Sequence, residues 1–333
     1  MASIIDVAKK AGVSKSTVGR VFSKNDYGVS KDTKEKVIKA ANELGYIKNS
    51  LASSLRTNQT KTIILLIPDI SNYFWAEVSK GAQDYLDSVD YSLLVVSTYF
   101  KRETELKYLN IAEMNKIAGI LINTKDEMAD AIEKTHIPSI LLGNSSSKKE
   151  LPFSRVATDT ATGIDKIMKY LFEQGHRDIA IIDPHFANSE REYSNRINSY
   201  SQFLSENGVE VNPEFIFHLD ATIEEGRKFA KTFADMKNKP TAIICSNDFF
   251  AISLVNELFE LGINVPSDIS IVGVDGIILT DMIRPRLTTL EKQKYEMGRT
   301  AAMMLVDQIN GKDEITNIKL ETKLKIRDSV KKL

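Results

Sequence analysis

From residue 61 onward, short apolar runs alternate with segments of helical period, and this alternation restricts the possible folds more than any other feature of the sequence. The apolar runs lie at 62–68, 91–97, 118–122, 139–142, 155–157, 179–183, 215–218, 241–245 and 269–273. Amphipathic helical spacing fills most gaps between them, for example at 77–89, 162–174, 196–207, 249–261 and 294–310. Strands that are apolar on both faces and separated by helices are typical of parallel, helix-covered sheets. The number of runs predicts two such sheets.

The first 60 residues have a different texture, in which three compact helices are expected from their caps. Ser3 precedes an apolar stripe as an N-cap, and Gly12 ends that helix. Ser14 is placed to cap a second helix after a tight turn. Ser30 is placed to cap a third, which ends before Gly45. The chain is therefore expected to begin with a small all-α head.

Charge is distributed unevenly between these two parts. Residues 1–60 contain 11 of the 44 Lys and Arg but only 5 of the 45 Asp and Glu, which makes the head +6 and the remainder −7. A basic head on a mildly acidic body suggests that the head meets a polyanion, although a solvated helix face would also produce an imbalance.

Residues 6–21 have the spacing of a helix-turn-helix motif. Ala8 is small where two helices would cross, Gly12 lies in the turn, and Val18 and Val21 bury the inner face of the second helix. The side chains left on the outer face are Lys15, Ser16, Gly19 and Arg20. In a major groove, the arginine is able to donate two hydrogen bonds to one guanine, and the lysine and serine to reach base edges or phosphates. The alternative is an amphipathic helix that simply exposes its cations to water.

Motifs around this segment resemble the amino-terminal signature of LacI/GalR-family transcriptional regulators. They are Ile5-Asp6-Val7-Ala8, Ala11-Gly12-Val13-Ser14, Thr17-Val18, Arg20-Val21, Val29-Ser30, Lys36-Val37, Leu44-Gly45-Tyr46, Asn49, Leu51-Ala52 and Ser54-Leu55-Arg56. The segment 67–72, Ile-Pro-Asp-Ile-Ser-Asn, is similar to the start of the family's core. The resemblance implies a helix-turn-helix domain at 1–48, a hinge helix and linker at 49–60, and a periplasmic-binding-protein-like core at 61–333. The core would have lobes at about 61–158 and 159–286, with the C-terminal segment crossing between them.

The resemblance also implies a homodimer that binds double-stranded DNA at a palindromic operator. Its DNA-contacting residues would be Ser3, Lys15, Ser16, Thr17, Arg20, Tyr46, Asn49, Leu55 and Arg56. Leu55 would insert into a minor-groove base step, and the hinge helix, too short to be stable alone, would form only when paired on DNA. One departure is Gly19, where the family usually has Ser. A glycine there disfavours the helix by up to about 1 kcal/mol relative to alanine.

Polar and aromatic side chains follow several of the predicted strands, where ligands of open α/β sheets bind. The candidate effector-binding residues are Asn72, Tyr73, Phe74, Arg196, Asn247 and Asp275. Carboxylate, amide and guanidinium groups beside aromatic rings suit a sugar-sized polyol. The resemblance places Arg196, Asn247 and Asp275 where the family's effector-contacting residues lie. The alternatives are helix caps for Asn247 and Asp275, and core or interface packing for the aromatic residues.

Departures from the family pattern bear on the effector. Gly276 stands where the family often has a second Asp, and Ala221 stands where several members have an aromatic residue. Residues 190–192 read Glu-Arg-Glu, and these charged side chains favour a sugar, sugar acid or sugar phosphate over a neutral purine as the effector. The expected function is a repressor of carbohydrate-utilisation genes. The alternatives are a catabolite regulator that uses a phosphorylated carrier protein, a purine- or nucleoside-responsive repressor, and an exported sugar-binding module.

Catalytic signatures are missing from the sequence. The four histidines have no metal-ligand spacing, and the sequence contains no glycine-rich phosphate loop and no Gly-x-Ser-x-Gly turn. The single cysteine, Cys245, lies in an apolar run and cannot form an internal disulfide. We therefore expect no enzyme activity and no cofactor. The start of the chain has no long apolar stretch, so a cytoplasmic protein without a membrane segment is expected.

Overall fold

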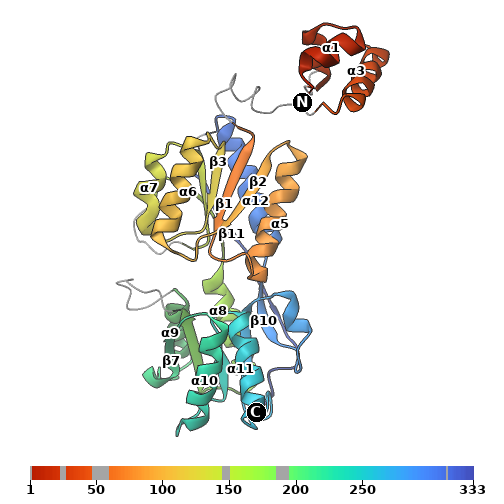
Figure 1. Ribbon diagram of the computed structural model, residues 1–333. Coiled ribbons are helices and arrows are strands. Elements are labelled where there is room, and N and C mark those ends of the chain that lie inside the picture. The colour runs from red at the N-terminus through yellow and green to blue at the C-terminus, as the bar shows by residue number, and fades with distance from the viewer. Residues whose placement is uncertain (1, 23–27, 47–59, 145–150, 185–194, 313) are drawn as a thin grey trace. The chain divides into compact units, whose positions relative to one another are not determined.

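The computed structural model describes residues 2–22, 28–46, 60–144, 151–184, 195–312 and 314–333. The chain divides into two compact units, Met1–Thr60 and Lys61–Leu333 (Figure 1). The first is a helical head, and the second contains two α/β lobes.

The head consists of α1 (Ile4–Ala11), α2 (Lys15–Phe22) and α3 (Lys31–Glu43). Ser3 caps α1 in a reciprocal capping box with Asp6, and Gly12 ends it in the left-handed conformation at φ 65°. Ser30 caps α3 by accepting a hydrogen bond from the backbone of Thr33. The three expected helices and their caps are confirmed. Their buried core is Val7, Ala8, Val18, Val21, Val37, Ala40 and Ala41.

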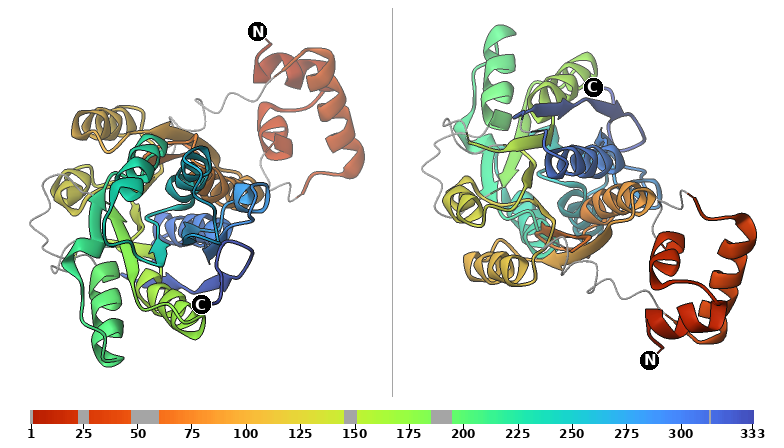
Figure 2. Two further views of the ribbon diagram at one scale, coloured as in Figure 1. Left: turned by 90° about the horizontal axis from the view of Figure 1, so that it is seen from below. Right: turned by 90° about the horizontal axis from the view of Figure 1, so that it is seen from above.

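The first lobe is built on a parallel six-stranded sheet in the order β11-β5-β4-β3-β1-β2. Its strands are β1 (Thr62–Ile67), β2 (Ser92–Ser97), β3 (Gly119–Ile122), β4 (Ser139–Leu142), β5 (Ser154–Thr158) and β11 (Asn317–Leu320). One face is covered by α5 (Tyr73–Ser88) and α12 (Lys294–Ile309), and the other by α6 (Arg102–Met114), η1 (Asp126–Met128) and α7 (Ala129–Lys134). The α5–α12 pair lies side by side in each view (Figure 2).

The second lobe has a six-stranded sheet in the order β12-β10-β9-β8-β6-β7, parallel except for the β10–β12 pair. Its strands are β6 (Ile179–Pro184), β7 (Ile216–Leu219), β8 (Ala242–Ile244), β9 (Ser270–Asp275), β10 (Thr288–Lys292) and β12 (Thr322–Lys325). Helices α8 (Thr160–Glu173) and α9 (Asn195–Glu206) cover one face, and α10 (Ile223–Asp235) and α11 (Asp248–Glu260) the other. The short helices η2 (Pro213–Phe215) and η3 (Ile278–Asp281) precede β7 and β10.

Every predicted apolar run overlaps an observed strand, and two helix-covered sheets are confirmed. The strands that were not predicted are β10, β11 and β12. Edge strands β11 and β12 alternate exposed polar residues with buried or half-buried ones, so they lack the continuous apolar character that marks the central strands. Another difference is that α5 begins at Tyr73 rather than residue 77, because Asn72 caps it.

The chain passes between the two lobes at three places: from β5 to α8, from β10 to α12, and from β11 to β12. The crossing at α12 leads into a close helix contact. Gly81 and Gly298 leave no room for a Cβ atom between α5 and α12, because each faces backbone of the opposite helix. This packing fixes the start of α12 next to the end of β10, where the polar residues described below are gathered.

Candidate functional site

In the head, α2 presents the predicted DNA-contacting side chains on its outer face. Lys15, Ser16 and Arg20 are exposed, whereas Val18 and Val21 are buried. The Ser14 hydroxyl accepts a hydrogen bond from the backbone N–H of Thr17 at 3.1 Å and lies 2.7 Å from the Ser16 hydroxyl. These bonds fix the first turn of the helix that carries the cations. A groove-reading role for this face stays a prediction.

The other predicted DNA contacts have different surroundings. The Tyr46 ring packs 5.6 Å from that of Phe22, and Ser3 is engaged with Asp6 in the cap of α1. Thr17 is half-buried beside Ser14. The Gly19 position has open space, because a Cβ atom there would meet no other atom within 4 Å. Asn49, Leu55 and Arg56 lie outside the described residues.

In the second lobe, Arg196 reaches the segment after β8 that contains Asn247. The Arg196 guanidinium donates to the carbonyl of Ser246 at 2.7 Å. Asn247 is the N-cap of α11: its side-chain oxygen accepts from the N–H of Phe250 at 2.8 Å, and its amide donates to the carbonyl of Ala221 at 2.9 Å. The cap alternative thus describes Asn247 in this structure, and its contact with an effector stays a prediction.

Asp275, at the end of β9, forms a buried ion pair with Lys292 at the end of β10. Their side chains are 2.9 Å apart and only 11% and 9% exposed. Strand pairing produces this contact, because Asp275 lies opposite Glu291 on β10. Burial lowers the pKa of Lys292, and the charge of Asp275 acts in the opposite direction. Lys292 was missed by the sequence analysis because β10 was not predicted as a strand.

A second buried lysine, Lys294, connects this strand end to the first lobe. Its ammonium donates to the carbonyls of Asp275 at 3.0 Å and Gly276 at 2.9 Å, and lies 3.8 Å from the Glu77 carboxylate on α5. Since Lys294 is the first residue of α12, it holds the loop after β9 against the helix pair of the first lobe. This residue was also missed, since its role depends on the crossing between the lobes.

Asp248, the first residue of α11, has a fully buried carboxyl group that packs against β9 and β10. The Thr289 hydroxyl donates to one of its oxygens, and the Ile277 N–H donates to the other at 2.8 Å. Burial, followed by the charge of Asp275, raises the pKa of Asp248 to about 8. This carboxyl is therefore mostly protonated near neutral pH.

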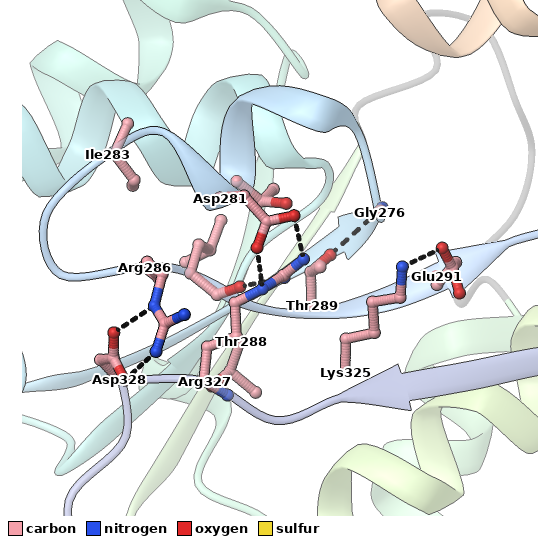
Figure 3. A network of polar contacts seen from close by, with 12 residues as sticks. Gly276, Asp281, Ile283, Arg286, Thr288, Thr289, Glu291, Lys325, Arg327 and Asp328 are labelled. Atoms are coloured by element: carbon pink, nitrogen blue, oxygen red, sulfur yellow. Dashed lines mark hydrogen bonds and ion pairs between the residues drawn. The ribbon is translucent and has the colours of Figure 1, made fainter.

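The loop after β9 is also held by the C-terminal segment (Figure 3). The Arg327 guanidinium donates to the Asp281 carboxylate at 2.9 Å and to the Leu287 carbonyl at 2.7 Å. Arg286 pairs with Asp328 at 2.8 Å near the same point (Figure 3). The Arg327 contacts restrain η3 and the start of β10, the strand that carries Lys292, whereas the Arg286–Asp328 pair is about half exposed.

The aromatic candidates come from the start of α5. Phe74 is buried, and the Lys292 ammonium lies 5.4 Å from its ring centroid. The Phe74 ring therefore lies beside the Asp275–Lys292 ion pair. The exposed Tyr73 ring lies 6.3 Å from that of Phe249 on α11. Asn72 is different, because its side-chain oxygen accepts from the N–H of Phe74 as the cap of α5. Phe74 and Asp275 thus both contact Lys292, whereas Arg196 contacts the carbonyl of Ser246, the residue before Asn247.

Other chemically notable side chains have structural surroundings. His176 is buried, with ring nitrogens 2.9 Å from the Thr241 hydroxyl and 3.1 Å from the Lys331 carbonyl. Burial raises the pKa of the Cys245 thiol well above its usual value. The described residues contain no cluster of three or more His, Cys, Asp or Glu suited to a metal ion. Within the same residues, no helix combines the length and apolarity needed to cross a membrane.

Comparison with known proteins identifies both units. Residues 3–49 match the bacterial regulatory proteins of the lacI family, and 168–330 match a periplasmic binding protein-like domain. The regulator RegA of Clostridium saccharobutylicum is 32% identical over 331 residues, covering 98% of each chain. The repressor PurR of Vibrio vulnificus is 32% identical over the full length of both chains. The chain belongs to the LacI family.

Solved structures of LacI-family regulators have the same architecture. The Lac repressor dimer bound to operator and the anti-inducer ONPF covers 99% of both chains at a TM-score of 0.85 and 24% identity, which supports the fold. A LacI-family regulator from Enterococcus faecium with bound ribose is 26% identical, with a TM-score of 0.71, and covers 82% of this chain and 99% of its own. The predicted family and fold class are confirmed, and this LacI-family chain is a DNA-binding transcriptional regulator. Its relatives are regulators and not enzymes.

Proposed function

We propose that this LacI-family regulator represses carbohydrate-utilisation genes as a homodimer on a palindromic operator, under the control of a small sugar or sugar derivative. In this proposal residues 1–48 read DNA, 49–60 form the hinge, and 61–333 bind the effector and dimerise. A regulator that acts on the chromosome of a bacterium works in the cytoplasm.

The observation that carries the effector proposal is the polar set at the carboxyl ends of β8, β9 and β10. Arg196 at the start of α9, Asn247 after β8 and Asp275 at the end of β9 supply guanidinium, amide and carboxylate groups. Phe74 at the start of α5 supplies a ring beside Lys292, the partner of Asp275. This combination suits adjacent hydroxyl groups and the C–H surface of a sugar. Further support comes from the E. faecium relative, whose structure contains ribose.

For DNA recognition, we propose that α2 enters the major groove with Lys15, Ser16 and Arg20 toward the bases or phosphates. Ser3, Thr17 and Tyr46 would contact the backbone with Asn49, and Leu55 and Arg56 would act in the minor groove. Effector binding would change the spacing of the two hinge segments of the dimer and so alter operator affinity.

A paired measurement tests the proposal. Neutral sugars, sugar acids and sugar phosphates are screened for thermal stabilisation of the full-length protein, and each hit is added to an operator-binding titration. We expect one class to stabilise the protein and to change operator affinity, in either direction. Asp275→Asn should abolish the response, whereas Asp328→Asn, an exposed control in the same lobe, should retain it.

Two results would contradict the proposal. Stabilisation by a phosphorylated carrier protein and by no small sugar would favour the catabolite-control alternative. A full effector response in Asp275→Asn would remove Asp275 from the effector site.

A further inference from the structure

Two buried polar atoms at the ends of neighbouring strands have no hydrogen-bond partner. Across the described part of the chain, such atoms are the Asp183 Oδ1, the Ser246 Oγ and the Gln308 Oε1. Asp183 is 3% exposed at the end of β6, and Ser246 is 1% exposed just after β8. Buried polar groups in folded proteins are nearly always hydrogen-bonded, so two unpartnered side-chain oxygens at one sheet edge need an explanation.

Strand register places these two side chains together. On the paired strands β6 and β8, Ile181 lies opposite Ile244, so Asp183 and Ser246, each two residues further on, lie at the same level. Both isoleucines belong to the core on the α8–α9 face, and side chains two residues apart along a strand point to the same face. Asp183, at the end of β6, and Ser246, two residues after β8, therefore lie at the same edge of the sheet without bonding to each other, where Arg196, at the start of α9, reaches the Ser246 carbonyl.

Other buried acids in the core show that this lack of partners is not general. Asp248 accepts hydrogen bonds from Thr289 and from the backbone of Ile277. Glu105, in the first lobe, accepts from Thr124 at 2.7 Å and is approached by Thr98 at 3.5 Å. An acid that served only to stabilise the fold would be paired in this way, because burying an unpaired carboxylate is unfavourable.

The described charges around the sheet edge balance one another. The acidic side chains of Asp183 and Asp275 are matched by the basic side chains of Arg196 and Lys292, and Lys294 faces the Glu77 carboxylate. The raised pKa of Asp248 keeps that carboxyl mostly protonated near neutral pH. The set therefore offers no net charge to attract an ionic ligand, and a carboxylate only accepts hydrogen bonds. An uncharged molecule rich in hydroxyl donors matches both features.

We propose that Asp183 and Ser246 bind hydroxyl groups of an uncharged polyol effector, and that Asp183 excludes sugar acids and sugar phosphates from this position. The inference rests on the proposed function, in which the effector binds at the carboxyl edge of this sheet, and it narrows the effector to neutral sugars.

Calorimetric titration of the full-length protein tests the assignment. The ligands are neutral pentoses, hexoses and disaccharides, including ribose and cellobiose, each with its acid, phosphate and amino counterpart. The variants are Asp183→Asn and Ser246→Ala. Ser253→Ala is the matched control, because it truncates a buried serine of the same lobe that donates to the Phe250 carbonyl at 2.9 Å.

We expect a neutral sugar to bind the wild type at least about tenfold more tightly than its acid or phosphate, as expected for a hydrogen bond to a charged group. Asp183→Asn should weaken binding of the neutral sugar by about tenfold and reduce the ratio of its affinity to that of the acid. Ser246→Ala should weaken binding of the neutral sugar by less than this, and Ser253→Ala should leave that affinity unchanged. Without ligand, Asp183→Asn should raise the melting temperature, because a neutral amide is less unfavourable to bury than a carboxylate with one unpartnered oxygen.

Each opposite result is decisive. Tighter binding of an acid, phosphate or amino sugar by the wild type would overturn this inference and leave the proposed function standing. A lower melting temperature of ligand-free Asp183→Asn would show that the carboxylate stabilises the fold, which also overturns it. If no member of the panel binds a protein that still binds operator, the carbohydrate effector itself is wrong, and this inference with it.

Discussion

The head and the core use charged side chains in opposite ways. In the head, Lys15 and Arg20 are exposed on α2, and the ion pair between Lys10 and Glu43 is also largely in water. In the core, Lys292 and Asp275 are buried against each other. Exposed ion pairs contribute little to folding, whereas separating a buried pair is strongly destabilising. We therefore expect charge changes on the exposed face of the head to alter binding alone, and changes at the buried pair of the core to alter stability and ligand response together.

The largest effect is expected for Asp275→Ala, which leaves Lys292 buried without its carboxylate. Removing one partner of a buried ion pair destabilises proteins by about 3–5 kcal/mol. Urea unfolding should show a loss of this order, and effector response should disappear. Asp328→Ala is the control, because its partner Arg286 is about half exposed, and its unfolding midpoint should stay close to that of the wild type. A similar loss of unfolding free energy in both variants would contradict the distinction between the buried and the exposed ion pair.

The next effect concerns the pH dependence contributed by Asp248. Folding raises the pKa of this carboxyl from its ordinary 3.8 to about 8, so between these values the folded state holds a proton that the unfolded state releases. The resulting stabilisation is fully present below about pH 4 and is lost as the pH rises toward 8, by up to about 1.4 kcal/mol per pH unit. Asp248→Asn should flatten this dependence in urea unfolding at pH 5.5 and 7.5. An unchanged slope would show that Asp248 is ionised in the folded protein.

A smaller effect, confined to DNA binding, is expected for Arg20→Ala in the head. Loss of a bidentate base contact should weaken specific operator binding by about 1–3 kcal/mol. Because the side chain is exposed, the unfolding midpoint and effector affinity should be unchanged. Titrations with operator and random duplexes at one salt concentration measure the difference. An equal loss on both duplexes would mean that Arg20 contacts only phosphates.

The smallest effect is expected at Gly19, where the α2 backbone is helical and a Cβ atom has open space. Gly19→Ala should stabilise the head by up to about 1 kcal/mol through helix propensity alone. Gly12→Ala is the matched control. Its position is equally open, but its backbone φ is +65°, so a side chain there is strained and should destabilise the head. Thermal unfolding of both variants would separate the two cases, and stabilisation by both would contradict this account.

Features that depend on neighbours along the chain were predictable from the sequence. The caps Ser3 and Ser30 and the terminator Gly12 act within one helical turn, so short motifs were enough to locate the head helices. The apolar central strands were predicted for a similar reason, because burial on both faces leaves a continuous run of residues. Edge strand β12 escaped prediction, since only one of its residues, Thr322, is buried.

The sequence by itself determined the family, the head and the two sheets, and it named Arg196, Asn247 and Asp275 as candidates. Only the tertiary structure paired Asp275 with Lys292, placed Lys294 between the lobes, and brought Asp183 level with Ser246. These contacts join strands that are distant in sequence, and their energies depend on how much water the fold removes from each group. A linear pattern records which side chains are present, whereas strand register and burial decide which of them interact.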